Sequence, residues 1–275
     1  MESHPNSPIG VFDSGVGGLS ILRALRAQLP SEHFVYLADS GFAPYGERED
    51  SFVVERVNAV ARQLLDDHAI KALVIACNTA TAAGLDELRA ELPVPIIDVI
   101  GPGARALVQT TVTGRVGVIG TVGTMASGAY VRAVGETGVP VSLTSSACPG
   151  FVEFVERGQT TGDEVTVLAE RLLAPIRDAN VDALLLGCTH YPFLARTISE
   201  VMGPDITLVS SADETAFAII DRLRPLGLLR GDERVGRHRF VSSGDVELFR
   251  ELGAQMLGPE LDHTERWDPP LPDPS

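Results

Sequence analysis

Residues 70–79 read IKALVIACNT, and this stretch decides the fold because residues 181–190, VDALLLGCTH, follow the same template. Each segment has an apolar and a charged residue, Ala-Leu, two aliphatic residues, a small residue, and then Cys followed by polar residues. A short apolar run bounded by polar residues is typical of a buried parallel strand. We therefore expect Cys77 and Cys188 each to stand at the end of a buried strand.

A second pair of segments supports an internal repeat. Residues 10–14, GVFDS, resemble residues 117–121, GVIGT, and the two pairs of segments are offset by 107 and 111 residues. A repeat of this length predicts two pseudo-symmetric lobes. We expect residues 1–100 together with 211–275 to form the first lobe, and residues 101–210 to form the second.

Apolar, β-branched runs alternate with helical periodicity along most of the chain. This alternation is typical of α/β proteins whose mostly parallel sheets are covered by helices. The predicted strands span 9–13, 34–37, 72–76, 95–99, 116–120, 141–144, 183–187 and 207–209. The predicted helices span 18–28, 50–67, 124–136, 163–178 and 211–223. We expect residues 1–7 and 268–275 to be mobile tails.

The carboxyl ends of the strands predict where a ligand binds. Parallel sheets bind ligands at these ends, so Cys77 and Cys188 would face one cleft between the lobes from opposite sides. Two thiols flanking one carbon atom can take a proton from one face and return a proton to the other, which inverts a stereocentre. Backbone N–H groups that open the following helix would favour the thiolate. Because a thiol has an ordinary pKa of about 8.5, we expect it to need little adjustment.

A single cysteine after an aliphatic strand is more often a packing residue than a catalyst, since free cysteines are among the most buried residues. The duplicated context of Cys77 and Cys188, each followed by polar residues, favours function for this pair. Cys148 has no counterpart in the repeat, and we interpret it as structural. Three cysteines so far apart predict neither a disulfide framework nor a thiolate metal site.

The composition narrows the class of protein. The chain has 275 residues, of which 44% are hydrophobic, so it can form one or two ordinary cores. A net charge of −15 opposes binding to nucleic acid or to an anionic membrane. No apolar stretch is long enough to span a bilayer, and the first residues lack the features of a secretory signal. We therefore expect a cytoplasmic protein that acts on a small molecule.

Several blocks of the sequence resemble the signature blocks of the glutamate racemases. They are GVFDSGVGGL at 10–19, PYG at 44–46, VIACNTATA at 74–82, GVIGT at 117–121, LGCTHYP at 186–192 and SSADETA at 210–216. The resemblance implies a cofactor-independent racemase that interconverts L- and D-glutamate and supplies D-glutamate for peptidoglycan, the cell wall and cell shape. It also implies that no cofactor and no metal take part, and that the protein is a homodimer.

The resemblance further implies roles for individual residues. Cys77 and Cys188 match the two proton-transfer thiols, the first usually assigned to the D-enantiomer and the second to the L-enantiomer. Asp13 matches the acidic residue near the first thiol, His190 matches the imidazole beside the second, and Glu156 matches a further assisting carboxylate. The positions that hold the amino and carboxylate groups of the substrate are matched by Asp13, Ser14, Tyr45, Gly46, Asn78, Thr79, Thr121, Thr189 and His190.

One segment departs from the pattern of the family. Where Pro-Leu-Phe-Val-Pro is typical, residues 149–153 read PGFVE. We expect Gly150 to loosen the backbone there, and Glu153 to add a second carboxylate near Glu156.

Three other interpretations stay open. An aspartate racemase is the nearest, although related aspartate enzymes typically carry an acidic residue where this chain has His190. A thiol hydrolase built on Cys188 and His190 is the second, with side chains that we expect to diverge after the strand. The third is a module that binds an anionic metabolite without catalysis. The glycines after Asp13 do not form G-x-G-x-x-G and no P-loop lysine follows, which argues against nucleotide binding. We interpret Asp39-Ser40 as turn or cap residues only.

Overall fold

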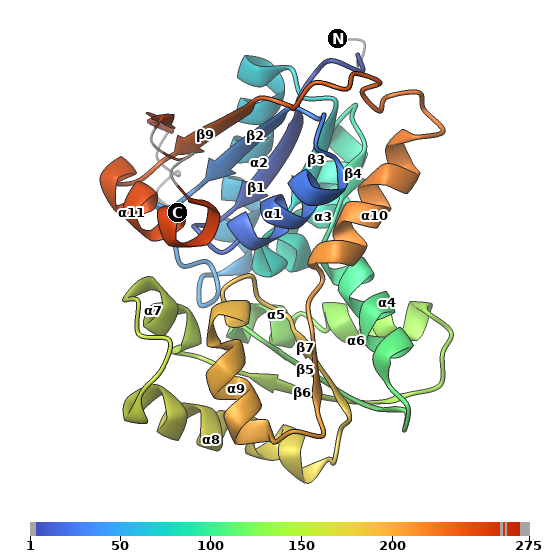
Figure 1. Ribbon diagram of the computed structural model, residues 1–275, viewed down its shortest axis with the longest axis vertical. Coiled ribbons are helices and arrows are strands. Elements are labelled where there is room, and N and C mark those ends of the chain that lie inside the picture. The colour runs from blue at the N-terminus through green and yellow to red at the C-terminus, as the bar shows by residue number, and fades with distance from the viewer. Residues whose placement is uncertain (1–3, 259–260, 262, 270–275) are drawn as a thin grey trace.

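The computed structural model describes residues 4–258, 261 and 263–269, and it contains two parallel β-sheets, one above the other in Figure 1. The first sheet has the order β10-β9-β2-β1-β3-β4 and the second has the order β6-β5-β7-β8. The strands of the first sheet are β1 (Ile9–Asp13), β2 (Phe34–Ala38), β3 (Ala72–Ile75), β4 (Ile96–Ile97), β9 (His238–Ser242) and β10 (Thr264–Arg266). Those of the second are β5 (Arg115–Gly120), β6 (Ser142–Ala147), β7 (Ala183–Leu186) and β8 (Thr207–Val209).

Helices cover both sheets. The longer ones are α1 (Leu19–Gln28), α2 (Asp50–His68), α3 (Asn78–Glu91), α4 (Ile100–Thr110), α8 (Asp163–Asp178), α10 (Ala212–Leu223) and α11 (Val246–Leu257). The shorter ones are α5 (Val122–Ala126), α6 (Ala129–Glu136), α7 (Phe151–Glu156), α9 (Ala195–Met202) and the 3₁₀ turn η1 (Tyr191–Leu194).

The two sheets confirm the α/β class and the repeat. β2-β1-β3-β4 of the first sheet and β6-β5-β7-β8 of the second follow the same order, with β1 equivalent to β5 and β3 equivalent to β7. These are the strands of the two repeated sequence patterns. β9 and β10 extend the first sheet beyond β2.

The central strands β1, β2 and β3 of the first sheet are buried on both faces, as their continuous apolar runs predict. In β1, Ile9 and Val11 pack in a core with residues of α1, α10 and α11, while Phe12 points to the opposite core, which is formed with α2 and α3. The second sheet is likewise placed between a core with α7, α8 and α9 and a core with α4 and α6. The two sheets are therefore packed supports for the loops that follow their strands.

The structure corrects several predicted elements. The predicted strand 95–99 is only two residues long, Ile96–Ile97; Pro95 has no N–H for a sheet bond, and Asp98 accepts bonds from the first N–H groups of α4. The predicted helix 124–136 is divided into α5 and α6 by Gly128, whose φ of +67° lies outside the helical region. Seven further helices and strands (α3, α4, α7, α9, α11, β9 and β10) and the 3₁₀ turn η1 lie outside the predicted spans.

The chain passes between the lobes at two places. After β4, helix α4 packs in the core of the second sheet, and after β8, helix α10 packs in the core of the first. Both helices lie at the right of Figure 1 and contact each other. The boundaries at residues 100/101 and 210/211 stay a prediction.

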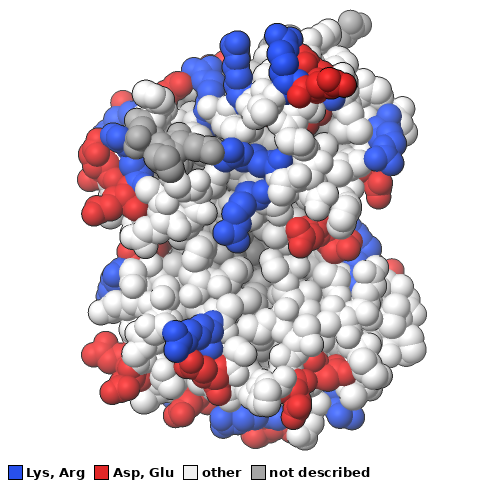
Figure 2. All heavy atoms as spheres, in the orientation of Figure 1, with Lys and Arg blue, Asp and Glu red and all other residues white. Residues whose placement is uncertain are grey.

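The surface shown in Figure 2 carries acidic and basic side chains interspersed over both lobes, and the molecule narrows at a waist between them. The excess of negative charge is therefore not gathered into a single patch on this face. Within the described ranges, no helix is long and apolar enough to cross a bilayer.

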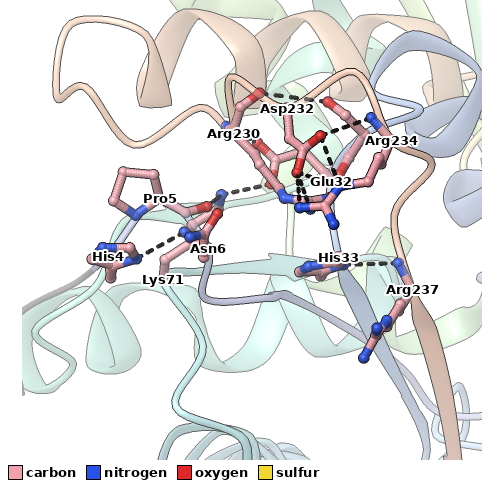
Figure 3. Close-up of polar contacts among 11 residues, drawn as sticks. His4, Pro5, Asn6, Glu32, His33, Lys71, Arg230, Asp232, Arg234 and Arg237 are labelled. Atoms are coloured by element: carbon pink, nitrogen blue, oxygen red, sulfur yellow. Dashed lines mark hydrogen bonds and ion pairs between the residues drawn. The ribbon is translucent and has the colours of Figure 1, made fainter.

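A buried ion pair joins chain segments at the amino ends of the first sheet's strands. The Lys71 ammonium lies 2.6 Å from Glu32 Oε2, and both side chains are at most 1% exposed (Figure 3). Lys71 Nζ also donates to the Pro5 carbonyl, and Glu32 Oε1 accepts from the Arg230 backbone N–H. Part of the predicted N-terminal tail is thus held against the sheet. Of the two predicted tails, the structure describes residues 4–7 and 268–269. Residues 1–3 and 270–275 lie outside the described residues.

Candidate active site

A cavity of about 20 Å³ lies between the carboxyl ends of the strands of the two lobes. Its lining residues are Ser14, Pro44, Tyr45, Gly46, Cys77, Asn78, Thr79, Thr121, Val152, Glu156, Cys188, Thr189 and His190. The structure therefore brings together every residue singled out for the site except Asp13, which is fully buried and bonded to Thr189 of this lining. Cys148 and Glu153 are not among the lining residues.

The first thiol begins a helix. Cys77 follows β3, and its Sγ accepts a bond from the Ala80 N–H at 3.5 Å and contacts Ser14 Oγ at 3.6 Å. Burial, followed by the nearby Asp13 carboxylate, nevertheless raises the pKa of Cys77 to about 12. The expectation of little pKa adjustment is therefore wrong for this thiol, because its desolvation outweighs the helix N–H groups. In this structure, where the lobes are in contact around the cavity, the Cys77 thiol therefore keeps its proton near neutral pH.

The second thiol lies beside an imidazole. Cys188 Sγ is 3.9 Å from His190 Nδ1, and His190 Nε2 is 3.6 Å from Glu156 Oε1, just beyond hydrogen-bond length. The expectation that the Cys188 and His190 side chains diverge is wrong, since the turn after β7 brings them together. Burial lowers the pKa of His190, but the contacts with Cys188 and Glu156 and the Asp13 charge outweigh it and raise this pKa to about 10. His190 is thus an imidazolium near neutral pH.

The raised pKa of His190 predicts how stability depends on pH. A group with a higher pKa in the folded protein stabilises it fully below its ordinary pKa of about 6.5, and this contribution is lost as the pH rises through about 10. We expect the advantage of the wild type over His190→Asn in free energy of unfolding to decline from pH 6 to pH 10. Urea unfolding of both proteins across this range measures it, and parallel pH profiles would contradict the assignment.

A glycine-rich turn after β1 holds Asp13. Asp13 accepts bonds from the Gly15 N–H at 2.8 Å and from Thr189 Oγ1 of the other lobe at 3.1 Å. Its complete burial raises its pKa. Tyr36 fixes the same turn by donating to the Gly15 carbonyl at 2.8 Å. The turn is therefore a contact between the lobes as well as a strand end.

Gly17 allows this contact. A Cβ at Gly17 would lie 2.5 Å from Thr189 Oγ1 and 2.7 Å from His190 Nδ1, which is shorter than real contacts. We expect Gly17→Ala to hold the lobes apart and to lower kcat about 100-fold for the racemisation expected from the sequence. A displacement of catalytic groups by about 1 Å has effects of that order. Steady-state kinetics measure this, with Gly135→Ala as the control because a Cβ there meets nothing within 4 Å. Wild-type turnover by Gly17→Ala would contradict it.

Direct hydrogen bonds join the lobes around the cavity. Thr79 Oγ1 bonds Thr121 Oγ1 at 2.9 Å and Thr124 Oγ1 at 3.2 Å. Asn78 Nδ2 donates to the Tyr130 hydroxyl at 2.7 Å. Tyr130 and Thr124 were not among the predicted site residues. No local sequence signal identifies them, because each is recognised only through its partner across the cleft.

Backbone donors surround the cavity. The backbone N–H groups of Ser14, Tyr45, Gly46, Asn78, Thr79, Thr189 and His190 have no acceptor within the part of the chain that the structure describes. Several of them stand where a helix or turn begins after a strand, which is a favourable place for an anion. A carboxylate bound at these groups would supply the missing acceptors.

The unusual segment 149–153 begins α7. Gly150 adopts a φ of +90°, a conformation that glycine adopts without strain, so it fixes a defined turn. The sequence predicts that Gly150 loosens the backbone; in the structure the position instead requires glycine for its positive φ. Glu156 from α7 lines the cavity, with about a third of its side chain exposed. Among the described residues, no three His, Cys, Asp or Glu side chains are placed to hold a metal ion.

Comparison with known proteins assigns the class. A family model described as Asp/Glu/Hydantoin racemase matches residues 14–218, and the chain belongs to this family and is an isomerase. Its similarity to glutamate racemases in particular extends over nearly the full length. The glutamate racemase of Parafrankia sp. is 48% identical over 256 residues, which cover 93% of this chain and 92% of the relative.

Solved structures agree with this assignment. A glutamate racemase isoform from Bacillus anthracis has a TM-score of 0.91 and 39% identity, covering 96% of this chain and 98% of that chain. The glutamate racemase of Francisella tularensis in complex with D-glutamate has a TM-score of 0.88 and 32% identity over the same shares of the two chains. The fold class predicted from the repeat is thus confirmed.

Proposed function

We propose that this racemase interconverts L- and D-glutamate by proton transfer between two thiols. The observation that carries the proposal is that Cys77 and Cys188, which follow equivalent strands of the two lobes, line one cavity. A negative charge on Cys188 would also raise the pKa of Cys77, so the two thiols are close enough to influence each other. The near-full-length similarity to glutamate racemases supports glutamate as the substrate.

The two thiols account for both proton transfers of the reaction. Starting from L-glutamate, a Cys188 thiolate takes the proton from Cα, and the electrons of the broken C–H bond move into the carboxylate to give an enediolate. The Cys77 thiol then donates its proton to the opposite face of Cα, which gives D-glutamate and leaves Cys77 as the thiolate. The reverse reaction uses the same groups in the opposite order. Burial keeps Cys77 protonated, and this suits the L-to-D direction.

Lowering the barrier requires stabilising the enediolate. The unsatisfied backbone N–H groups around the cavity can donate to the carboxylate as its charge grows. Each donor placed in this way supplies on the order of 3 kcal/mol in other enzymes. Asp13, Glu156 and His190 are proposed to assist the two thiols, and Ser14, Tyr45, Gly46, Asn78, Thr79, Thr121 and Thr189 to hold the substrate.

Substrate entry requires the lobes to separate. The cavity has room for about one water molecule, so glutamate does not fit in this closed form. Opening would break the bonds between Thr189 and Asp13, Asn78 and Tyr130, and Gly46 and Gly123. All of these are single, reversible hydrogen bonds, and a less complete closure around the substrate would still exclude water.

The function is tested by incubating the protein with each glutamate enantiomer in D₂O without added cofactor. We expect optical rotation to decay to zero from either side, with deuterium incorporated at Cα. Absence of inversion by the folded protein contradicts the proposal. Inversion of aspartate in preference to glutamate supports the aspartate alternative. Hydrolysis of small amides or glutamine without inversion supports a thiol hydrolase, which the Cys188–His190 contact allows but which leaves Cys77 without a role.

The biological setting follows from the same proposal. D-Glutamate made by this reaction would serve peptidoglycan synthesis in the cytoplasm. These assignments, and a homodimeric state, stay predictions.

A further inference from the structure

A buried ion pair between Asp39 and Arg56 lies next to the loop that lines one side of the cavity. The loop between β2 and α2 brings Tyr45 and Gly46 to the cavity and begins at Asp39. Asp39 accepts a hydrogen bond from the Tyr45 hydroxyl. Arg56 of α2 donates from Nε to Asp39 Oδ2 at 2.9 Å and from Nη2 to Oδ1 at 3.0 Å. All three side chains are at most 1% exposed, so Asp39 is more than the turn or cap residue expected from the sequence.

Two aromatic rings lie near the Arg56 guanidinium. The Arg56 guanidinium carbon lies 3.8 Å from the centre of the Phe42 ring and 5.7 Å from that of Trp267. Phe42 belongs to the same loop, while Trp267 comes from the segment that follows β10. A planar cation held by a bidentate carboxylate and by ring faces has few alternative orientations. The pair is therefore a rigid support for the loop.

This support determines how Tyr45 can act. Burial, followed by the Asp39 charge, raises the pKa of Tyr45 well above its ordinary value, so the phenol keeps its proton. That single proton is donated to Asp39, and the hydroxyl has none left for a substrate. The backbone N–H groups of Tyr45 and Gly46, by contrast, have no acceptor among the described residues. The Gly46 carbonyl accepts from the Gly123 N–H at 2.9 Å, which ties the loop to the other lobe.

We infer that Asp39 and Arg56 are positioning residues, which act through the Tyr45 hydroxyl to hold the N–H groups of Tyr45 and Gly46 for a carboxylate of the substrate. The loop binds through its backbone, and the phenol is a tether. This inference rests on the proposed function, because it takes the dicarboxylate substrate from there.

The tether is tested with Tyr45→Phe, which keeps the ring and removes the hydroxyl that donates to Asp39. We expect KM for both glutamate enantiomers to rise about tenfold, the effect of one lost hydrogen bond, with kcat changed much less. Arg56→Lys keeps the charge but loses the two-pronged contact, and we expect KM to rise in the same way. A loss of folded protein alone would lower the apparent kcat and leave KM unchanged, so the two parameters separate positioning from stability.

The buried pair of Glu32 and Lys71 provides a matched control. It supports the same sheet from the amino ends of the strands, away from the cavity. Lys71→Arg, the counterpart of Arg56→Lys, is expected to lower the melting temperature and to leave KM unchanged. An unchanged KM in Tyr45→Phe, or equal KM changes in Arg56→Lys and Lys71→Arg, would overturn the inference.

A readout that needs no turnover separates this inference from the proposed function. In ¹⁵N-labelled protein we expect addition of D-glutamate to shift the amide protons of Tyr45 and Gly46 downfield, and the shift to be smaller in Arg56→Lys. A wild-type protein that shows these shifts without racemising glutamate contradicts the proposed function and supports the role of the loop. Racemisation without shifts at these two amides overturns the inference alone.

Discussion

Cys77→Ala and Cys188→Ala are each expected to lower the rate of glutamate racemisation by at least about 1,000-fold, because each thiol serves one face of Cα. The imidazolium of His190 cannot accept a proton, and the Asp13 carboxyl is bonded to the Gly15 N–H and to Thr189. Optical rotation followed from each pure enantiomer measures the loss.

Cys148→Ala is the matched control. Cys148 is as buried as the other two cysteines, and burial raises its pKa to about 12 as well, but it does not line the cavity. We expect this variant to racemise at close to the wild-type rate. Substantial racemisation by either Cys77→Ala or Cys188→Ala, or a loss in Cys148→Ala equal to theirs, would remove the two-thiol mechanism.

Isotope exchange distinguishes the two thiols. If Cys188 serves L-glutamate and Cys77 serves D-glutamate, then Cys77→Ala retains a base only on the face from which the L-enantiomer loses its proton. We expect this variant in D₂O to exchange the Cα proton of L-glutamate faster than that of D-glutamate, without inversion. Cys188→Ala should show the opposite preference. Equal exchange of both enantiomers by each variant would contradict the assignment of faces.

The positions of the main strands could be predicted because their signals are local. Residues 72–75 and 183–186 are continuous aliphatic runs, each followed by a small residue, Cys and polar residues, and they form β3 and β7. β9, His238–Ser242, has a short apolar run after two basic residues, and its pairing with β2 spans about 200 residues of sequence. Such a strand is defined by the partner that it pairs with, so a local pattern does not reveal it.

Some residues of the candidate site could likewise be predicted from local sequence signals, and others could not. Cys77, Ser14 and Thr189 directly follow or nearly follow strands, and topology alone brings the carboxyl ends of parallel strands together. Asp39 could not be recognised, because its partner Arg56 is 17 residues away and a buried ion pair has no local signature. The high pKa of Cys77 depends on its burial and on the nearby Asp13 carboxylate, which composition and spacing do not report.

Lys71→Met is expected to lower the free energy of unfolding by about 3–5 kcal/mol, the usual effect of leaving one member of a buried ion pair without its partner. Among the described residues, Glu32, 1% exposed, would then have the Arg230 N–H as its remaining donor, and the Pro5 carbonyl would lose its bond to Lys71. Urea unfolding at pH 7 measures the change. Turnover per folded molecule should stay at the wild-type value, since the pair is at the end of the sheet opposite the cavity.

The double variant Glu32→Gln/Lys71→Met decides whether the loss is due to the stranded charge. Burial lowers the pKa of Lys71 despite the opposing influence of Glu32, so the ammonium is less favourable in the folded protein than in water. Removing both charges should then cost less than removing one, and a glutamine oxygen can still accept from the Arg230 N–H. We expect the double variant to recover most of the stability lost in Lys71→Met. If the two substitutions instead destabilise additively, the contribution of these residues lies in packing and in the contacts with Pro5 and Arg230, and the electrostatic explanation is wrong.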